Sequence, residues 1–178
     1  MKVHANSRDM VIAILFGAAA FISGFTIAMP LALATGIPIL PGIIMPIIIN
    51  IFFVNAALSS RMFGSATASA FEYGLLSIPF AILGPPYFLP KIMVITFPTV
   101  FLDILITLKR TALGCTIGGF ICAFPVNFLM IVFLNLFGVP LIPGMMELLF
   151  PIQIILSAEG FIGGFLGWKI YCRLNPLV

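Results

Sequence analysis

The stretch LGPPYFLPKIMVITFPTVFLD, Leu83 to Asp103, decides the fold, because a proline-rich turn and a lysine lead there into a long apolar run. Its first three prolines restrict φ and remove backbone N–H donors, so the chain turns stiffly before a helix begins near Lys91. The apolar run from Ile92 to Leu108 carries one charge and is followed by a Lys-Arg pair. Membrane-spanning helices end in this way on the cytoplasmic side. The stretch therefore predicts a transmembrane helix whose lysine end faces outside.

The composition of the chain indicates a membrane protein. Of its 178 residues, 62% are hydrophobic and 7% are charged, whereas an ordinary soluble domain has about 25% charged residues. Eight basic residues give a net charge of +3, but they are scattered and form no basic cluster with interleaved aromatics, so nucleic-acid binding is not expected. The length suits about six spans of ~20 residues.

Six apolar segments follow one another along the chain. We expect an all-α integral membrane protein, a single six-helix domain 1–178, with transmembrane helices at 10–29, 43–58, 65–82, 91–108, 111–136 and 150–170. The first apolar run could be read as a secretory signal with a cleavage site near Ala32–Ala34. That run is longer than the ~7 to 15 residues of such a signal and five more segments follow, so we expect an uncleaved first helix.

The basic residues predict the topology. If the amino terminus is inside, the inner segments collect Lys2, Arg8, Arg61, Lys109, Arg110, Lys169 and Arg173, and the outer segments hold Lys91 alone. By the positive-inside rule, both termini lie in the cytoplasm and the protein crosses the cell membrane several times. The same topology places most prolines on the outer side. Constrained irregular backbone near membrane depth is tolerated where it lines a cavity, so we expect a binding face open to the outside.

Small residues recur at helical spacing on three of the spans. In the first span Ala13, Gly17, Ala20 and Gly24 share one face, which allows another backbone to approach closely. This face fits either a membrane partner or a neighbouring helix of the same bundle. Glycines in the fifth and sixth spans have similar spacing, and for them packing within the bundle is the expected role.

Polar groups within membrane spans are expensive and are therefore candidates for function. Asp103 is best explained as an interior structural partner, whereas Glu72 fits helix–helix hydrogen bonding and ligand contact equally well. The candidate substrate-binding residues are Glu72, Tyr87, Lys91, Asn127, Glu147, Gln153 and Glu159. Aromatic rings beside Lys91 suit a flat heterocycle with an anionic or carbonyl group, while the acids suit a cationic ring equally well.

Several chemistries find no support in the residues. The chain has no G-x-x-x-x-G-K-[ST] loop for nucleotide phosphates. Its one histidine, His4, lies in the polar amino-terminal segment, which leaves no metal-ligand set and no histidine base within the membrane. We expect no catalytic residues, no metal site, no cofactor and no enzymatic activity.

The small-residue face at Ala13 and Gly17, the short Arg61 turn, and the GPPYFLPK entry to a helix ending in FLD resemble the substrate-binding S components of energy-coupling factor (ECF) transporters. The resemblance covers nearly the whole chain. It implies high-affinity capture of a vitamin or related micronutrient from outside, together with a membrane coupling protein and two cytosolic ATPases. By position, it implies substrate contacts at Lys91, Asn127, Glu147, Gln153 and Glu159, and a docking face at Ala13, Gly17 and Ala20.

Two other classes of protein stay open. One is a small polytopic channel or structural membrane protein, which would show a continuous polar path or no pocket at all and would retain no small molecule on purification. The other is an intramembrane enzyme, for which Glu72, Asp103 and Glu159 are the candidate groups. Wide separation of those three acids would count against it.

Overall fold

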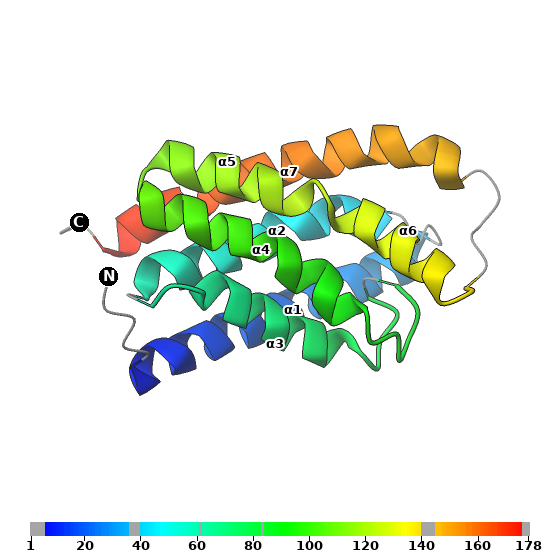
Figure 1. Ribbon diagram of the computed structural model, residues 1–178, viewed down its shortest axis with the longest axis horizontal. Helices are drawn as coiled ribbons and strands as arrows, with labels where there is room; N and C mark the ends of the chain where they lie inside the picture. The colour runs from blue at the N-terminus through cyan, green and yellow to red at the C-terminus, as the bar shows by residue number, and fades with distance from the viewer. Residues whose placement is uncertain (1–5, 36–39, 61, 83, 140–144, 176–178) are drawn as a thin grey trace.

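The computed structural model describes residues 6–35, 40–60, 62–82, 84–139 and 145–175, and within these ranges the protein is helical with no strand. Its helices run roughly along one long axis (Figure 1). They are α1 (Ser7–Thr35), α2 (Leu40–Ser59), α3 (Ser65–Ser77), α4 (Lys91–Leu108), α5 (Ala112–Ala123), α6 (Val126–Leu136) and α7 (Met145–Leu174). The all-α architecture agrees with the sequence prediction.

The predicted fifth span is bent in the structure. α5 ends at Ala123 and α6 begins at Val126, so one apolar segment is divided by a short turn. Pro125 lies in this turn and has no backbone N–H for a helical hydrogen bond, which explains the break. With α5 and α6 taken as one bent rod, the described chain forms six helical rods.

Four helical stretches of the described chain are long and apolar enough to cross a membrane. They are Ser7–Ile27, Lys91–Leu108, Ala112–Leu136 and Phe150–Leu174. α2 supplies a shorter apolar stretch, Ile44–Ser59, and α3 has 13 residues. The structure thus supports a helical membrane protein, while length alone identifies four crossings rather than six.

Helix boundaries differ from the prediction at several points. α4 has the predicted bounds, but α3 ends at Ser77 and not at 82, because Pro79 cannot donate the next helical hydrogen bond. α1 continues to Thr35, beyond the predicted residue 29, and Pro30 lies inside it. α7 begins at Met145, so it extends into the segment that was expected to be an outer connection.

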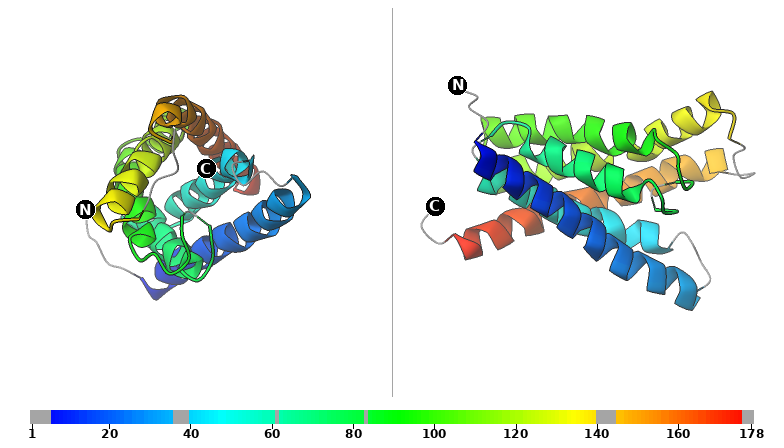
Figure 2. Two further views of the ribbon diagram at one scale, coloured as in Figure 1. Left: turned by 90° about the vertical axis from the view of Figure 1, so that its right-hand side faces the viewer. Right: turned by 90° about the horizontal axis from the view of Figure 1, so that it is seen from below.

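Viewed along the bundle axis, the helices are arranged around a ring with α2 drawn toward its interior (Figure 2), where α2 also contacts α3, α4 and α5. The order of neighbours around the ring is α1, α2, α7, α5, α4 and α3, and α3 returns to α1. α6 continues α5 toward the far end. Most helices therefore pack against the helix that precedes or follows them in the sequence. The exception is the contact between α2 and α7, the last helix.

The two ends of the bundle differ in character. α1 begins and α7 ends at the same end, on the left in Figure 1, and α5 begins there too. We call it the charged end, because its described residues include Arg8, Lys109, Arg110, Lys169 and Arg173. The opposite end, where α3 ends and α4 begins, is called the proline-rich end.

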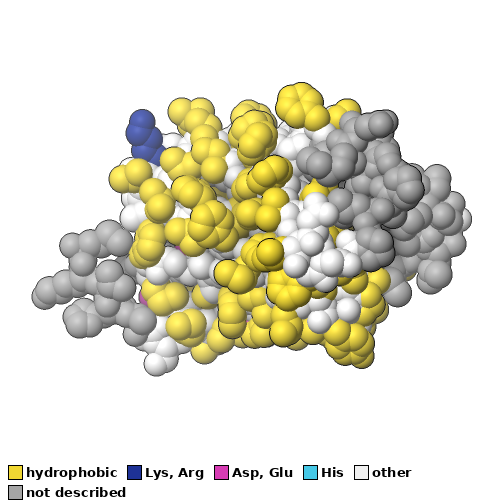
Figure 3. Space-filling view, turned by 45° about the vertical axis from the view of Figure 1, so that its right-hand side comes forward, with side chains coloured by type: hydrophobic (Ala, Val, Ile, Leu, Met, Phe, Trp, Pro, Cys, Tyr) yellow, Lys and Arg dark blue, Asp and Glu magenta, His cyan; other side chains and the backbone are white. Residues whose placement is uncertain are grey.

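The lateral surface is apolar and the interior contains an aromatic cluster. In space-filling view, hydrophobic side chains cover most of the described surface facing the reader (Figure 3). Phe21 lies within 6.5 Å, ring centre to ring centre, of Phe25, Tyr73 and Phe80, all inside or against the main core. An apolar exterior around a packed interior suits a protein surrounded by lipid.

Glycines bring α5 and α7 into close contact. A Cβ atom added to Gly119 would overlap the carbonyl oxygen of Gly160, and one added to Gly164 would overlap that of Cys115. Small residues at this seam let the two backbones touch. The prediction that the glycines of the last spans pack within the bundle is confirmed.

Candidate functional site

The predicted substrate residues do not all face one space. Lys91, Gln153 and Glu159 are buried, Glu72 and Asn127 are half-buried, and Tyr87 is 76% exposed with a positive φ of 60°. The side chain of Glu147 lies outside the described residues. The structure therefore separates the candidates into groups with different surroundings.

Lys91 is inside the protein and already bonded. Its side chain is fully buried, and Nζ donates hydrogen bonds to the carbonyl oxygens of Ser77, at 3.2 Å, and Phe80. These carbonyls lie at and just beyond the end of α3, where the regular helical hydrogen bonds stop; the Ser77 carbonyl also accepts from the Phe80 N–H, at 3.1 Å. A lysine ammonium at that position satisfies them and complements the negative end of the helix. Lys91 was expected at the outer rim; in the structure it fastens the start of α4 to the end of α3.

Tyr87 lies in the turn between α3 and α4 with its side chain on the surface. Its backbone N–H donates to the carbonyl oxygen of Ile78 at 2.6 Å, which holds the turn against the end of α3. The neighbouring Phe88 is buried and packs with Phe137, at a ring separation of 5.7 Å. Of the two aromatic residues beside Lys91, the buried Phe88 thus forms part of the packing, and Tyr87 is the reachable one.

Asp103 binds the other end of α3. Its carboxylate accepts hydrogen bonds from the backbone N–H groups of Ala66 and Thr67, at 3.1 and 2.8 Å, and from the Thr67 hydroxyl at 2.6 Å. The first turn of a helix has free N–H donors and a positive dipole end, so a carboxylate stabilises it. The interpretation of Asp103 as an interior structural partner is confirmed.

Buried polar atoms without partners occur at mid-depth and toward the proline-rich end. The side chains of Asn50, Gln153 and Glu159 are 3%, 7% and 6% exposed. Four buried side-chain oxygens have no hydrogen-bond partner among the described residues: Asn50 Oδ1, Gln153 Oε1, Glu159 Oε2 and, on α4, Thr96 Oγ1. The amide nitrogens are in use, since Asn50 donates to the carbonyl oxygen of Pro46 and Gln153 to that of Ala123. The oxygens of Asn50, Gln153 and Glu159 are hydrogen-bond acceptors, whereas the Thr96 hydroxyl can donate as well as accept.

Two of these acceptors lie along the same seam between α2 and α7. A Cβ atom on Gly163 would lie 2.9 Å from Cβ of Asn50, so the backbones nearly touch there. Glu159 precedes Gly163 by about one turn, and the Asn50 amide runs back to Pro46, also about one turn. The two helices run in the same direction, so Glu159 lies about one turn before the level of Asn50 along the seam. The sequence did not single out Asn50 as a site residue.

Gln153 reaches the adjoining seam between α7 and α5. It lies about two turns from Glu159 and donates to the Ala123 carbonyl at 3.1 Å. Ser157 is also buried on this side, but its hydroxyl donates to the Gln153 carbonyl at 2.7 Å and is satisfied. Asn50, Gln153 and Glu159 are thus buried side chains along the two seams of α7 whose acceptor oxygens lack partners, and we call them the acceptor cluster. An unsatisfied buried polar group costs about 1–3 kcal/mol, so a donor partner in this region would be strongly favoured.

The acidic residues are widely distributed. Glu72 lies at the contact of α3 with α1, where a Cβ on Gly17 would be 2.8 Å from Cβ of Glu72. Asp103 is on α4, and Glu159 is on α7, which has α2 and α5 as its main neighbours. This separation counts against the intramembrane-enzyme alternative. Within the described chain, no three His, Cys, Asp or Glu side chains form a group that could hold a metal ion.

The predicted docking face of the first helix is inside the bundle. Ala13 and Ala20 are fully buried, and a Cβ on Gly17 would overlap the Ser69 carbonyl oxygen. Ser69 also donates its hydroxyl to the Ala13 carbonyl at 2.6 Å. The small residues therefore serve α1–α3 packing, and the docking prediction for Ala13, Gly17 and Ala20 is wrong for this fold. The face of α1 that remains exposed carries Val11, Leu15 and Ile22.

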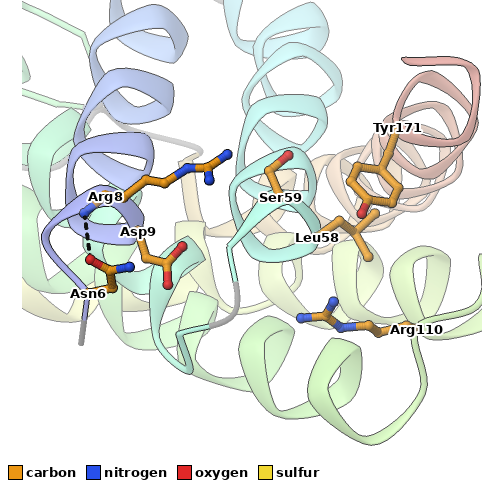
Figure 4. A pocket seen from close by; sticks show the side chains of 7 residues that line it. All are labelled: Asn6, Arg8, Asp9, Leu58, Ser59, Arg110 and Tyr171. Carbon is orange, nitrogen blue, oxygen red and sulfur yellow. Dashed lines mark hydrogen bonds between the residues drawn. The ribbon is translucent and has the colours of Figure 1, made fainter. Parts of the chain in front are cut away.

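A cavity at the charged end was not anticipated from the sequence. Its volume is about 520 Å³, and it lies between the start of α1, the end of α2, the start of α5 and the last turns of α7 (Figure 4). The lining residues are Asn6, Arg8, Asp9, Leu58, Ser59, Arg110 and Tyr171. They come from four separate segments of the chain, so no local sequence pattern connects them.

No family model, no curated protein and no solved structure matches this chain.

Proposed function

We propose that this protein is the membrane-embedded, substrate-binding S component of an ECF-type uptake system for a vitamin or related micronutrient. The observation that carries the proposal is the acceptor cluster: three buried polar side chains with unsatisfied oxygens inside an apolar helical bundle. Polar groups at membrane depth are expensive and persist where they bind something. A small polar molecule entering from the proline-rich end would supply the missing partners.

The chemistry of the cluster favours one of the two substrate classes that the sequence left open. The unpartnered amide oxygens of Asn50 and Gln153 can accept hydrogen bonds but cannot donate them. The same is true of Glu159 Oε2 when its carboxyl group is ionised. Lys91, at the proline-rich end, is committed to the carbonyls of Ser77 and Phe80. A substrate with N–H donors or a positive charge therefore fits better than an anionic one. We propose a nitrogen heterocycle or amine-bearing micronutrient.

In this proposal the chain supplies binding and another protein supplies energy. The sequence contains no nucleotide-phosphate loop, so a membrane coupling protein and two cytosolic ATPases would drive transport. Six membrane crossings with both termini in the cytoplasm would place the proline-rich end outside and the charged end inside. The substrate would then enter at the outer face and contact Glu159 about halfway across.

The experiment is identification of a retained ligand, followed by its titration. Protein purified gently from its host should carry a small nitrogen-containing molecule, seen by mass spectrometry at about one per chain. Glu159→Gln should weaken binding of that molecule tenfold or more, because a hydrogen bond to a charged group contributes about 1.5–3 kcal/mol.

A matched control lies two residues away on the same helix. Ser157→Ala removes a buried hydroxyl that is already satisfied within α7, so it should leave affinity nearly unchanged. If no molecule is retained and a panel of micronutrients gives no thermal shift, the binding proposal fails and the channel or structural alternative moves ahead. If Glu159→Gln raises the melting temperature and leaves affinity unchanged, Glu159 is a structural residue only.

A further inference from the structure

We propose that the cavity at the charged end binds the phosphate of an anionic phospholipid headgroup. The cavity is bordered by four helix ends, is open to the surface and has a volume of about 520 Å³. One water molecule occupies about 30 Å³ of liquid, and small-molecule sites commonly have ~300–1,000 Å³. The space is therefore large enough for a phosphate with its attached glycerol.

The charge of the lining suits an anion. Two guanidinium groups, Arg8 and Arg110, and one carboxylate, Asp9, line the cavity, so the lining is net positive by one charge. Within the described part of the chain neither arginine forms an ion pair. The close view shows the Arg8 guanidinium directed toward the end of α2 and away from the Asp9 carboxylate (Figure 4).

The two arginines are placed on opposite sides of the cavity. Arg110 is held by one hydrogen bond from Nη2 to the Ser60 carbonyl oxygen, at 3.0 Å. A guanidinium has five N–H donors in a planar fork, so most of its donors remain available. Such forks match phosphate oxygens in a bidentate way, and two of them can hold one phosphate from both sides.

Uncharged polar groups complete the lining. Asn6, Ser59 and Tyr171 each contribute a side chain with an N–H or O–H donor. Asn6 also accepts a hydrogen bond from the Arg8 backbone N–H, at 3.4 Å, which orients its amide at the start of α1. Tyrosine is enriched where apolar membrane meets water. These donors can bind the remaining phosphate oxygens or the glycerol oxygens.

The surroundings of the cavity favour a lipid over a soluble phosphate compound. Met10 and Val11 follow the cavity residues on α1 and are exposed apolar side chains, as are Ile170 and Leu174 on α7. A headgroup in the cavity could thus leave its acyl chains against apolar surface. Basic pockets between membrane helices on the cytoplasmic side are suited to anionic headgroups.

The test measures lipid retention by the full-length protein. Protein should be placed in nanodiscs of phosphatidylcholine containing a small fraction of phosphatidylglycerol, and the bound lipid counted by native mass spectrometry after detergent release. Preferential retention of phosphatidylglycerol is expected, and Arg8→Gln should reduce it about fivefold, the effect of one basic residue near an anionic membrane surface.

Lys109→Gln is the matched control, because Lys109 is exposed at the same end, has the same charge and does not line the cavity. Arg110→Gln should reduce retention as well. Because Arg110 also donates a hydrogen bond to the Ser60 carbonyl, the melting temperature of this variant should be measured to separate lost binding from lost stability. Equal effects of Arg8→Gln and Lys109→Gln would overturn the proposal, since general surface charge would then explain retention.

A second arm distinguishes the source of the phosphate. Inorganic phosphate is added to delipidated protein, with chloride at equal ionic strength as reference. If phosphate reduces phosphatidylglycerol binding to the parent protein but not to Arg8→Gln, the cavity is a phosphate site that a free anion can also fill. Lack of phosphatidylglycerol preference together with lack of any Arg8-dependent phosphate effect rejects the site.

Discussion

The hydroxyl of Thr67, in the first turn of α3, donates a 2.6 Å hydrogen bond to the carboxylate of Asp103 on α4. The same carboxylate accepts two backbone N–H groups of α3. At the other end of α3, Lys91 of α4 donates to the carbonyls of Ser77 and Phe80, at and just beyond the last residue of the helix. One helix thus uses an acid and a base, twelve residues apart, to secure both ends of its neighbour.

Asp103→Ala is expected to lower the free energy of unfolding by about 2 kcal/mol, because the N–H groups of Ala66 and Thr67 lose their acceptor. Asp103→Asn should cost less, since one oxygen remains. Thr67→Val should cost least, since it removes only the hydroxyl bond. Thermal or chemical unfolding in detergent measures this series. Equal stability of all three variants and the parent protein would contradict the capping role.

Lys91→Met is expected to lower the melting temperature while leaving the affinity of the folded protein for its substrate unchanged. The variant keeps the length of the side chain but removes the ammonium that binds both carbonyls; Ser77 keeps the hydrogen bond from the Phe80 N–H, whereas the Phe80 carbonyl loses its donor. Melting temperature and ligand titration should be measured on the same preparation. Loss of affinity at unchanged melting temperature would instead place Lys91 in the binding site.

Gly17→Leu is expected to destabilise the whole bundle, by about 3 kcal/mol or more, because the new side chain would meet the Ser69 backbone of α3. Ligand retention and assembly with any partner should then be lost together. Leu15→Ala, on the exposed face of the same helix, should change stability by less than about 0.5 kcal/mol. A folded Gly17→Leu protein that binds substrate but no partner would restore the docking interpretation.

Cysteine labelling is expected to place the two ends of the bundle on opposite sides of the membrane. Tyr87→Cys and Ser59→Cys put thiols at exposed positions on the proline-rich and charged ends, in a background with Cys172→Ser. A membrane-impermeant maleimide should modify position 87 on intact cells, and position 59 only after lysis. Labelling of position 59 on intact cells would reverse the topology predicted by the positive-inside rule.

The individual helices were readable from the sequence. The α4 boundaries follow from Pro90 before the apolar run and the basic pair after it. The bounds of α3 and α7 were missed, because hydropathy does not report where a backbone donor or acceptor finds its partner. Pro79 could have indicated the early end of α3, since proline removes the N–H that the helix would need.

The acceptor cluster was predicted in part. Gln153 and Glu159 are unusual within an apolar span and were identified as candidates by their residue type alone. Asn50 was not identified with them, because α2 and α7 are far apart in the sequence and meet only in the folded bundle. The residues that line the charged-end cavity, such as Asn6 and Tyr171, are also far apart in the sequence and meet only in the folded bundle, so the sequence did not predict this cavity.

The sequence by itself determined that the chain is a helical membrane protein and which residues carry charge into its spans, because hydropathy and charge are properties of local stretches. The tertiary structure alone decided which of those groups are already satisfied. Asp103 and Lys91 bind the ends of α3, Gly17 packs against Ser69, and Glu159 keeps an oxygen without a partner. The physical reason is that a buried polar group is stabilised by the donor or acceptor beside it in space, and the identity of that neighbour depends on how the helices are arranged.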